Sequence, residues 1–298
     1  PVTGARIRDP RGRREGHASV HERAPHASRP LREDRNFFAR LLRLFVARTT
    51  VVEGADVLGA ALRDHPSLVV VLNHGPAHAP LLPLAALALA VLDEGHAERR
   101  MLGVTFRGLY ALPLVRKLAA RVTPASSPPS FEGLVHALET GRCTDVVIMP
   151  EGQNCVVGDP SALKPFASPR FAELAIRTGR PVLLAVHHGT ERWAKRVEVP
   201  SRVPVHRVAS LVSRSLAHEV SRHGALALPV GMGRIPELRL AFAVHAPSLS
   251  PAAFAALAPD ERARRIAAEA ETIHAVMRTL HAGLGAAAVR DPKGLGRS

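Results

Sequence analysis

The 298-residue chain predicts an α/β fold in which a mainly parallel sheet is flanked by helices. The first observation is that short runs rich in Val, Ile and Leu recur along the chain, as buried strands do. The second is that segments with helical periodicity separate most of these runs, which favours parallel strands joined by helical crossovers. The third is a hydrophobic content of 46%, which is enough for one large core.

The N-terminal part predicts a tail and then one amphipathic helix. Residues 1–30 are rich in Arg, His, Gly and Pro and hold few apolar residues, which is typical of a disordered basic tail. Asp34 is placed to cap a helix over residues 35–48, in which Phe and Leu alternate with arginines. Such a helix suits a membrane surface as well as it suits the outside of a core, and the pattern alone does not separate the two.

One α/β domain is predicted over residues 31–285, with a frayed tail at 286–298. Its strands are expected at residues 51–57, 68–72, 101–105, 145–149, 181–187 and 238–244, with a short helix between the first two. Its further helices are expected at residues 80–93, 131–140, 169–178 and 260–284. Gly141 and Gly179 end two of these helices, because glycine readily takes the backbone conformation of a helix stop. Between residues 192 and 234 the pattern is less regular, with helical spacing at 203–220.

The composition limits which binding partners and which cellular compartment we expect. The formal net charge of +14 predicts a basic surface, which suits an anionic membrane or an acidic substrate. Nucleic-acid binding is the competing interpretation, but one Tyr and one Trp offer little stacking surface. The apolar run from Ala79 to Leu92 is too short to span a membrane, so peripheral association is expected. Cys143 and Cys155 are the only cysteines and no secretory segment is visible, so a reduced, cytoplasmic setting is expected.

Polar residues follow two of the predicted strands. Asn73 and His74 follow the run 68–72 and enter a turn rich in Gly and Pro, and Glu151 follows the run 146–149. Enzymes with α/β folds place reactive side chains at such strand ends, so a base and a carboxylate here suggest an active site. The alternatives are a histidine bonded to the backbone of its turn and a solvated carboxylate.

Together these segments resemble the motifs of the glycerolipid acyltransferases, the lysophospholipid acyltransferase superfamily that includes the 1-acylglycerol-phosphate acyltransferases. That family has Asn-His followed by four residues and an Asp, and later a Pro-Glu-Gly block. Asn73 and His74 match the first motif, and residues 150–152 match the second. Residues 163–182 are similar to the family's continuation, so the resemblance covers about residues 68–186. It implies the family's fold and transfer of a fatty acyl group from acyl-CoA or acyl carrier protein to a lipid acceptor, with no cofactor.

The resemblance also implies roles for single residues. His74 would be the general base that takes a proton from the acceptor hydroxyl. Glu151 would bind the acceptor or orient His74, and His78 is a weaker candidate for a relay. Residues expected to line the substrate site are Asn73, Pro150, Gly152 and Asn154, together with Arg107, since the family carries Lys or Arg near that position.

Three departures from the family pattern change the expectation. Ala79 stands where the family has the Asp that orients the histidine. Asn154 and either Ser126 or Ser127 stand where the family has arginines that bind the glycerol phosphate. A neutral hydroxyl or amine is therefore a more fitting acceptor than a phosphorylated one. The alternative is a catalytically inactive relative that binds lipid or acyl chains.

Other chemistries find little support in the sequence. His187 and His188 follow a predicted strand, but adjacent strand residues point to opposite faces, and no set of residues with metal-ligand spacing accompanies them. Cys155 lies near Glu151, although a buried structural cysteine is commoner than a thiol nucleophile. The sequence contains no nucleophile elbow, no phosphate-binding glycine loop and no dinucleotide fingerprint. We therefore expect neither a metal nor a cofactor.

Overall fold

The structure is a computed structural model that describes residues 28–104, 129–199 and 214–290. Its centre is a six-stranded sheet with the strand order β1-β8-β5-β2-β4-β3. The strands are β1 (Val46–Glu53), β2 (Leu68–Leu72), β3 (Met101–Gly103), β4 (Asp145–Ile148), β5 (Val182–His188) and β8 (Ile235–His245). Strands β3, β4, β2 and β5 run parallel, β8 is antiparallel to β5, and β1 is parallel to β8. The predicted mainly parallel α/β sheet is thus confirmed.

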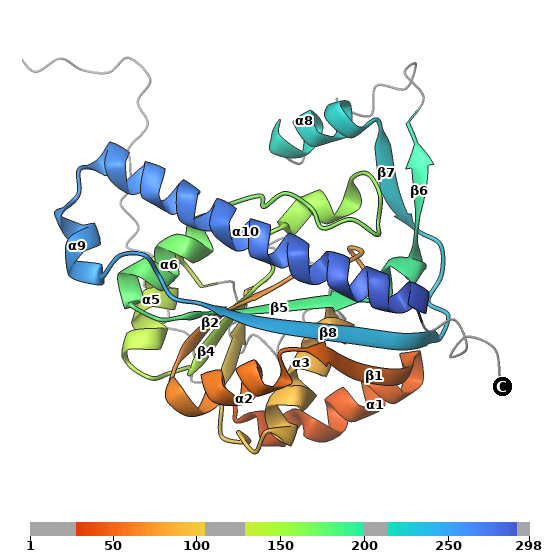
Figure 1. The fold of residues 1–298 in the computed structure, drawn as a ribbon, viewed down its shortest axis with the longest axis horizontal. Coiled ribbons are helices and arrows are strands. Elements are labelled where there is room, and N and C mark those ends of the chain that lie inside the picture. The colour runs from red at the N-terminus through yellow and green to blue at the C-terminus, as the bar shows by residue number, and fades with distance from the viewer. Residues whose placement is uncertain (1–27, 105–128, 200–213, 291–298) are drawn as a thin grey trace, which may run out of the picture.

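Helices cover both faces of this sheet (Figure 1). One face packs against α1 (Arg35–Phe45), α2 (Ala55–Asp64) and α3 (Leu81–Asp93), and the other against α5 (Phe131–Glu139), α6 (Arg170–Thr178) and α10 (Pro259–Arg290). Strand β2 has helices packed on both of its faces. Val70 belongs to the core on one face and Val69 to the core on the other, and all five residues of the strand are buried. A parallel strand buried on both sides reads as a continuous apolar run, which is how it was recognised in the sequence.

The segment after β5 holds elements that the sequence pattern did not predict. Strands β6 (Ala194–Glu198) and β7 (Ala225–Pro229) form a separate antiparallel pair. Strand β6 is largely exposed and lacks the apolar alternation that marks a half-buried strand. Strand β7 is short and buries only Ala225 and Ala227. The helix expected at residues 203–220 is described only from Arg214, where α8 (Arg214–His223) begins. The remaining short elements are η1 (Leu31–Asp34), η3 (Gly152–Val156), η4 (Thr190–Trp193) and α9 (Pro251–Ala256).

Several predicted boundaries were wrong. The N-terminal helix ends at Phe45 instead of residue 48, and the strand expected at 51–57 lies at 46–53. The chain leaves that strand at Gly54, whose φ is +77° and where a Cβ would lie 2.2 Å from the carbonyl oxygen of Phe242. Only glycine fits this left-handed turn, so α2 begins immediately after it. At the other end of the chain, α10 continues to Arg290, past the expected start of a frayed tail at 286.

The apolar stripe of α1 packs on the core. Phe38 is 2% exposed, and its neighbours Phe37, Leu41 and Phe45 pack against the same cluster. Helix α1 lies against α3, so Phe38 is buried and the other three side chains are partly buried. Of the two interpretations of this stripe, the structure therefore supports the helix packed on the core. No helix among the described residues combines the length and apolar character that a membrane span requires.

Some predicted features lie outside the described residues. They are most of the basic tail (residues 1–27), Arg107, and both Ser126 and Ser127.

Candidate active site

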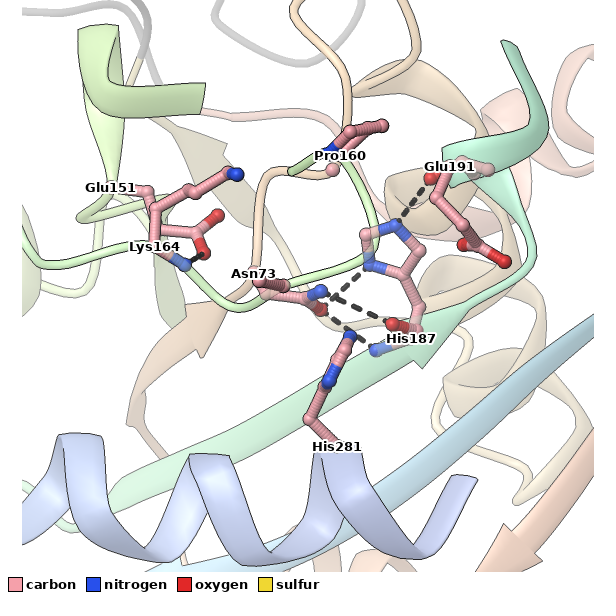
Figure 2. Close-up of a pocket in the computed structure, with 10 residues that line it drawn as sticks. Asn73, Glu151, Pro160, Lys164, His187, Glu191 and His281 are labelled. Carbon is pink, nitrogen blue, oxygen red and sulfur yellow. Dashed lines mark hydrogen bonds between the residues drawn. The ribbon is translucent and has the colours of Figure 1, made fainter. Parts of the chain in front are cut away.

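The carboxyl ends of β2, β4 and β5 meet at one edge of the sheet. The parallel register pairs Val71 with Ile148 and Leu72 with Ala185. Residues that follow these strands must therefore lie side by side, although they are distant in the sequence. Figure 2 shows the resulting cluster, in which His281 on α10 approaches the residues of the strand ends.

Asn73 and His187 are joined by three hydrogen bonds. Asn73 Nδ2 donates to the carbonyl oxygen of His187 at 3.1 Å, and Asn73 Oδ1 accepts from the His187 backbone N–H at 2.7 Å. Because a backbone N–H only donates and a carbonyl only accepts, this pairing fixes the orientation of the amide. Oδ1 also lies 2.7 Å from His187 Nδ1, so Nδ1 carries the hydrogen and donates it. The amide thereby sets the tautomer of His187.

The other nitrogen of His187 meets a hydroxyl. His187 Nε2 lies 2.8 Å from Thr190 Oγ1, and both residues are buried. Burial holds the pKa of His187 well below its usual value, and the neighbouring histidines 281, 188 and 74 lower it further. The ring is therefore neutral, Nε2 has a free lone pair, and the Thr190 hydroxyl donates to it.

Glu151 is bound by two backbone amides. Its Oε2 accepts from the His74 N–H at 2.5 Å, and its Oε1 accepts from the Lys164 N–H at 2.7 Å. The side chain is only 2% exposed, and burial raises the pKa of this carboxyl to about 7. The two amides and the Lys164 ammonium oppose that rise. Glu151 therefore ties the loop after β2 to the loop around residue 164, instead of being a solvated turn carboxylate.

His74 is held through its backbone, while one nitrogen of its ring has no partner. Among the described residues, His74 Nδ1 is buried without a hydrogen-bond partner. Burial lowers the pKa of this imidazole, although nearby backbone groups of Gly75 and Pro76 limit the shift. Ala79, which is 1% exposed, provides no acceptor at the position where the family has its Asp. The ring is thus neutral near pH 7, and within the described part of the chain no carboxylate bonds its Nδ1.

A small polar cavity lies beside these residues. The volume in which the centre of a water molecule fits is about 10 Å³, so the cavity has room for about one water. Lys164, Glu191 and His281 bring titratable side chains to its wall (Figure 2). The other lining residues are Asn73, Gly75, Glu151, Pro160, Ala162, His187 and Thr190. The cavity therefore collects residues from both segments that resemble the acyltransferase motifs.

The other predicted site residues that the structure describes do not line this cavity. His74 is partly exposed but is not among the lining residues. His78 stacks on Trp193 with ring centroids 5.8 Å apart. The carbonyl of Pro150 accepts from the Ala167 N–H at 2.7 Å.

Gly152 and Asn154 lie in η3, also away from the cavity wall. Asn154 Nδ2 donates to the carbonyl of Pro165 at 3.0 Å, and its Oδ1 has no partner in the described part of the chain. Burial raises the pKa of the nearby Cys155 thiol to about 12, so it is not a reactive thiolate at neutral pH.

Three residues of this cluster were not among the predicted site residues: His187, Thr190 and His281. His187 and His188 were set aside as a metal site because neighbours on a strand point to opposite faces. His187 does face the cavity, whereas His188 pairs with Glu191 at 3.3 Å and lies against His281. Within residues 28–104, 129–199 and 214–290, no group of three His, Cys, Asp or Glu side chains could hold a metal ion. The position of His187 at a strand end was the signal that could have identified it.

No protein-family model matches this chain, and no curated protein matches it.

Proposed function

We propose that this chain is an acyltransferase that moves a fatty acyl group from acyl-CoA or acyl carrier protein to the hydroxyl of a lipid-like acceptor. The observation that carries the proposal is the contact between two segments 77 residues apart, in which the His74 N–H donates to Glu151 at 2.5 Å. These are the segments whose residues resemble the acyltransferase motifs. They meet at the carboxyl edge of parallel strands, where α/β enzymes place their reactive groups.

In this proposal His74 is the general base. Its lowered pKa leaves the imidazole neutral near pH 7, so the ring can take a proton from the acceptor hydroxyl as that oxygen attacks the acyl carbonyl. Glu151 acts through the backbone: by binding the His74 N–H, it holds the loop that carries the ring. Glu151 is therefore a positioning residue.

The charges of the cavity favour an acceptor without a phosphate. Lys164 lines the cavity and could in principle replace the family's missing arginines. However, two carboxyl side chains, Glu151 and Glu191, line the same cavity. A phosphate dianion would meet no net positive charge there, so a neutral alcohol is the better substrate.

A second candidate function is lipid or acyl-chain binding without turnover. The Nδ1 of His74 has no hydrogen-bond partner among the described residues, which favours this candidate, because a protonated His74 needs an acceptor for its Nδ1–H. In the family the Asp supplies that acceptor, and here Ala79 stands in its place.

Peripheral association with an anionic membrane stays a proposal that rests on the net charge of +14. Helix α1 offers its arginines and Leu44, which is 68% exposed, while its other apolar side chains pack on the core. We therefore expect binding to anionic vesicles that is electrostatic and weakens as salt is added. Binding that does not respond to salt would contradict this expectation.

The test is acyl transfer by the purified full chain from labelled acyl-CoA and acyl carrier protein. Monoacylglycerol and lysophosphatidate are compared as acceptors, and His74→Gln is compared with His136→Gln, an exposed histidine on α5. We expect transfer to monoacylglycerol that falls about 100-fold or more in His74→Gln and persists in His136→Gln. A preference for lysophosphatidate would overturn the assignment of the acceptor, and full activity of His74→Gln would overturn the base.

Ala79→Asp separates the two candidate functions. If the chain is an enzyme that lacks its orienting carboxylate, Asp at this position should raise the rate of transfer. Lipid binding without transfer, both in the unchanged chain and in Ala79→Asp, would support the binding candidate instead.

A further inference from the structure

Thr190, His187 and Asn73 form a linear series of hydroxyl, imidazole and amide. Thr190 Oγ1 lies 2.8 Å from His187 Nε2, and His187 Nδ1 lies 2.7 Å from Asn73 Oδ1. Nucleophilic hydroxyls in enzymes are activated by the same order of groups, in which a base takes the proton and a third residue orients the base. Asn73 follows β2, His187 lies near the end of β5 and Thr190 begins η4, and all three residues are buried.

The direction of each hydrogen bond suits this role. The two bonds between the Asn73 amide and the backbone of His187 fix Oδ1 as the acceptor from Nδ1. The ring is neutral, so Nε2 accepts and the Thr190 hydroxyl is the donor. A neutral base already bonded to a hydroxyl is the ground state that nucleophilic attack by that oxygen requires.

Thr190 differs in this respect from threonines with a local structural role. Thr178 donates to the carbonyl of Leu174, and Thr140 donates to the carbonyl of His136, four residues earlier in each case. That local bond is what a helical threonine ordinarily makes. The Thr190 hydroxyl instead bonds a ring nitrogen of His187, and Thr190 lines the polar cavity.

Gly75 leaves one side of the hydroxyl without a side chain. A Cβ at Gly75 would lie 2.5 Å from Thr190 Oγ1 and 2.8 Å from His187 Nε2, and both Gly75 and Thr190 line the cavity. Thr190 has no exposure to bulk solvent, and the cavity is about one water in size. The cavity must widen to admit any acyl group, and small acyl groups need the least widening.

We propose that Thr190 is a second reactive group of this chain, a nucleophile that His187 activates and Asn73 orients, and that it takes up an acyl group from an activated ester or thioester. The Thr190 oxygen forms a bond to the acyl carbonyl carbon and its proton passes to His187 Nε2. The bond from that carbon to the thiolate or alkoxide leaving group then breaks, and the leaving group takes the proton from His187. The products are an acyl-threonine ester and a free thiol or alcohol.

This inference rests on the proposed function in one respect, because the ester would hold the acyl group between the donor and the acceptor. The uptake step itself does not need the lipid acceptor. It can therefore be tested with a small activated ester alone, so that the two proposals can fail separately.

The experiment treats the full-length protein with p-nitrophenyl acetate. We expect a burst of about one p-nitrophenolate per chain and a mass increase of one acetyl group that maps to the peptide containing Thr190. Thr190→Val, which keeps the shape and removes the hydroxyl, should lower the burst at least tenfold. Thr190→Ser should retain it, and so should the matched control Thr178→Val.

Each outcome decides one proposal. Acetylation at Lys164 or elsewhere, no acetylation, or an unchanged burst in Thr190→Val with a native far-UV spectrum would overturn the role of Thr190. An acetyl group on Thr190, with no transfer from acyl-CoA to any lipid, would support the nucleophile and count against the proposed function. Transfer to lipid that is unchanged in Thr190→Val, with no ester on Thr190, would overturn the inference and leave the proposed function standing.

Discussion

Asn73→Ala should destabilise the protein markedly, because one amide joins β2 to β5. The substitution removes three hydrogen bonds and leaves the backbone N–H, the backbone carbonyl and Nδ1 of His187 without partners. A buried hydrogen bond contributes about 0.5–1.5 kcal/mol net, so three amount to roughly 1.5–4.5 kcal/mol. Because Asn73 is 4% and His187 2% exposed, bulk water does not reach the groups that lose their partners, and we expect a loss of about 3–4 kcal/mol.

The measurement is urea unfolding at neutral pH, followed by circular dichroism, with thermal unfolding alongside it. For a chain of this size a loss of about 3 kcal/mol corresponds to a fall in Tm of roughly 6–12 °C. Asn36→Ala is the control, since Asn36 is exposed on α1 and its replacement should change stability by less than about 0.5 kcal/mol. If Asn73→Ala were as stable as Asn36→Ala, the amide would not hold the two strand ends together.

Three further predictions concern single positions. Gly75→Ala should unfold at a clearly lower temperature and lose the burst of p-nitrophenolate release, because φ at Gly75 is +62° and the new Cβ would lie 2.5 Å from Thr190 Oγ1. An unchanged unfolding temperature together with an unchanged burst would contradict this contact. The pKa of Glu151 is raised to about 7 by burial, so its stabilising contribution is present below the unfolded value of 4.5 and is lost as pH rises through about 7. Glu151→Gln should remove that slope, which urea unfolding at about pH 5 and about pH 8 would detect, and an identical slope would refute it. Phe38→Ala should cost about 3–5 kcal/mol and Leu44→Ala less than about 0.5 kcal/mol in the same assay, and near-equal values would mean that α1 is not packed on the core.

The layered α/β fold could be predicted because its signals are local. Strand β2 is a run of five buried aliphatic residues, and α6 ends at Gly179 with a φ of +62°, as the sequence indicated. Patterns of this kind depend only on residues that are near one another in the chain. The direction of β8, which is antiparallel to β5, has no such local signal. The direction of β8 depends on the path of the connection that brings the chain back to the sheet, and the residue pattern within a strand does not show that path.

The amphipathic stripe of α1 illustrates the same limit. The sequence recorded that Phe38 and Leu42 lie on one face and that arginines surround it. The sequence does not show what covers that face, because a membrane interior and the apolar side chains of a second helix are both suitable partners for it. Only the position of α3 decides that the stripe is buried in the protein.

At the site, the sequence by itself determined which strand ends carry Asn73, His74 and Glu151, because an apolar run followed by a Gly/Pro turn marks a strand end locally. The tertiary structure alone decided what those side chains touch. The register of β2 with β5 brings Asn73 to His187, 114 residues away, and the bend after β5 brings Thr190 to the same ring. A hydrogen bond forms between atoms about 3 Å apart in space, whatever the distance between their residues in the sequence. A pattern along the chain therefore cannot reveal these contacts.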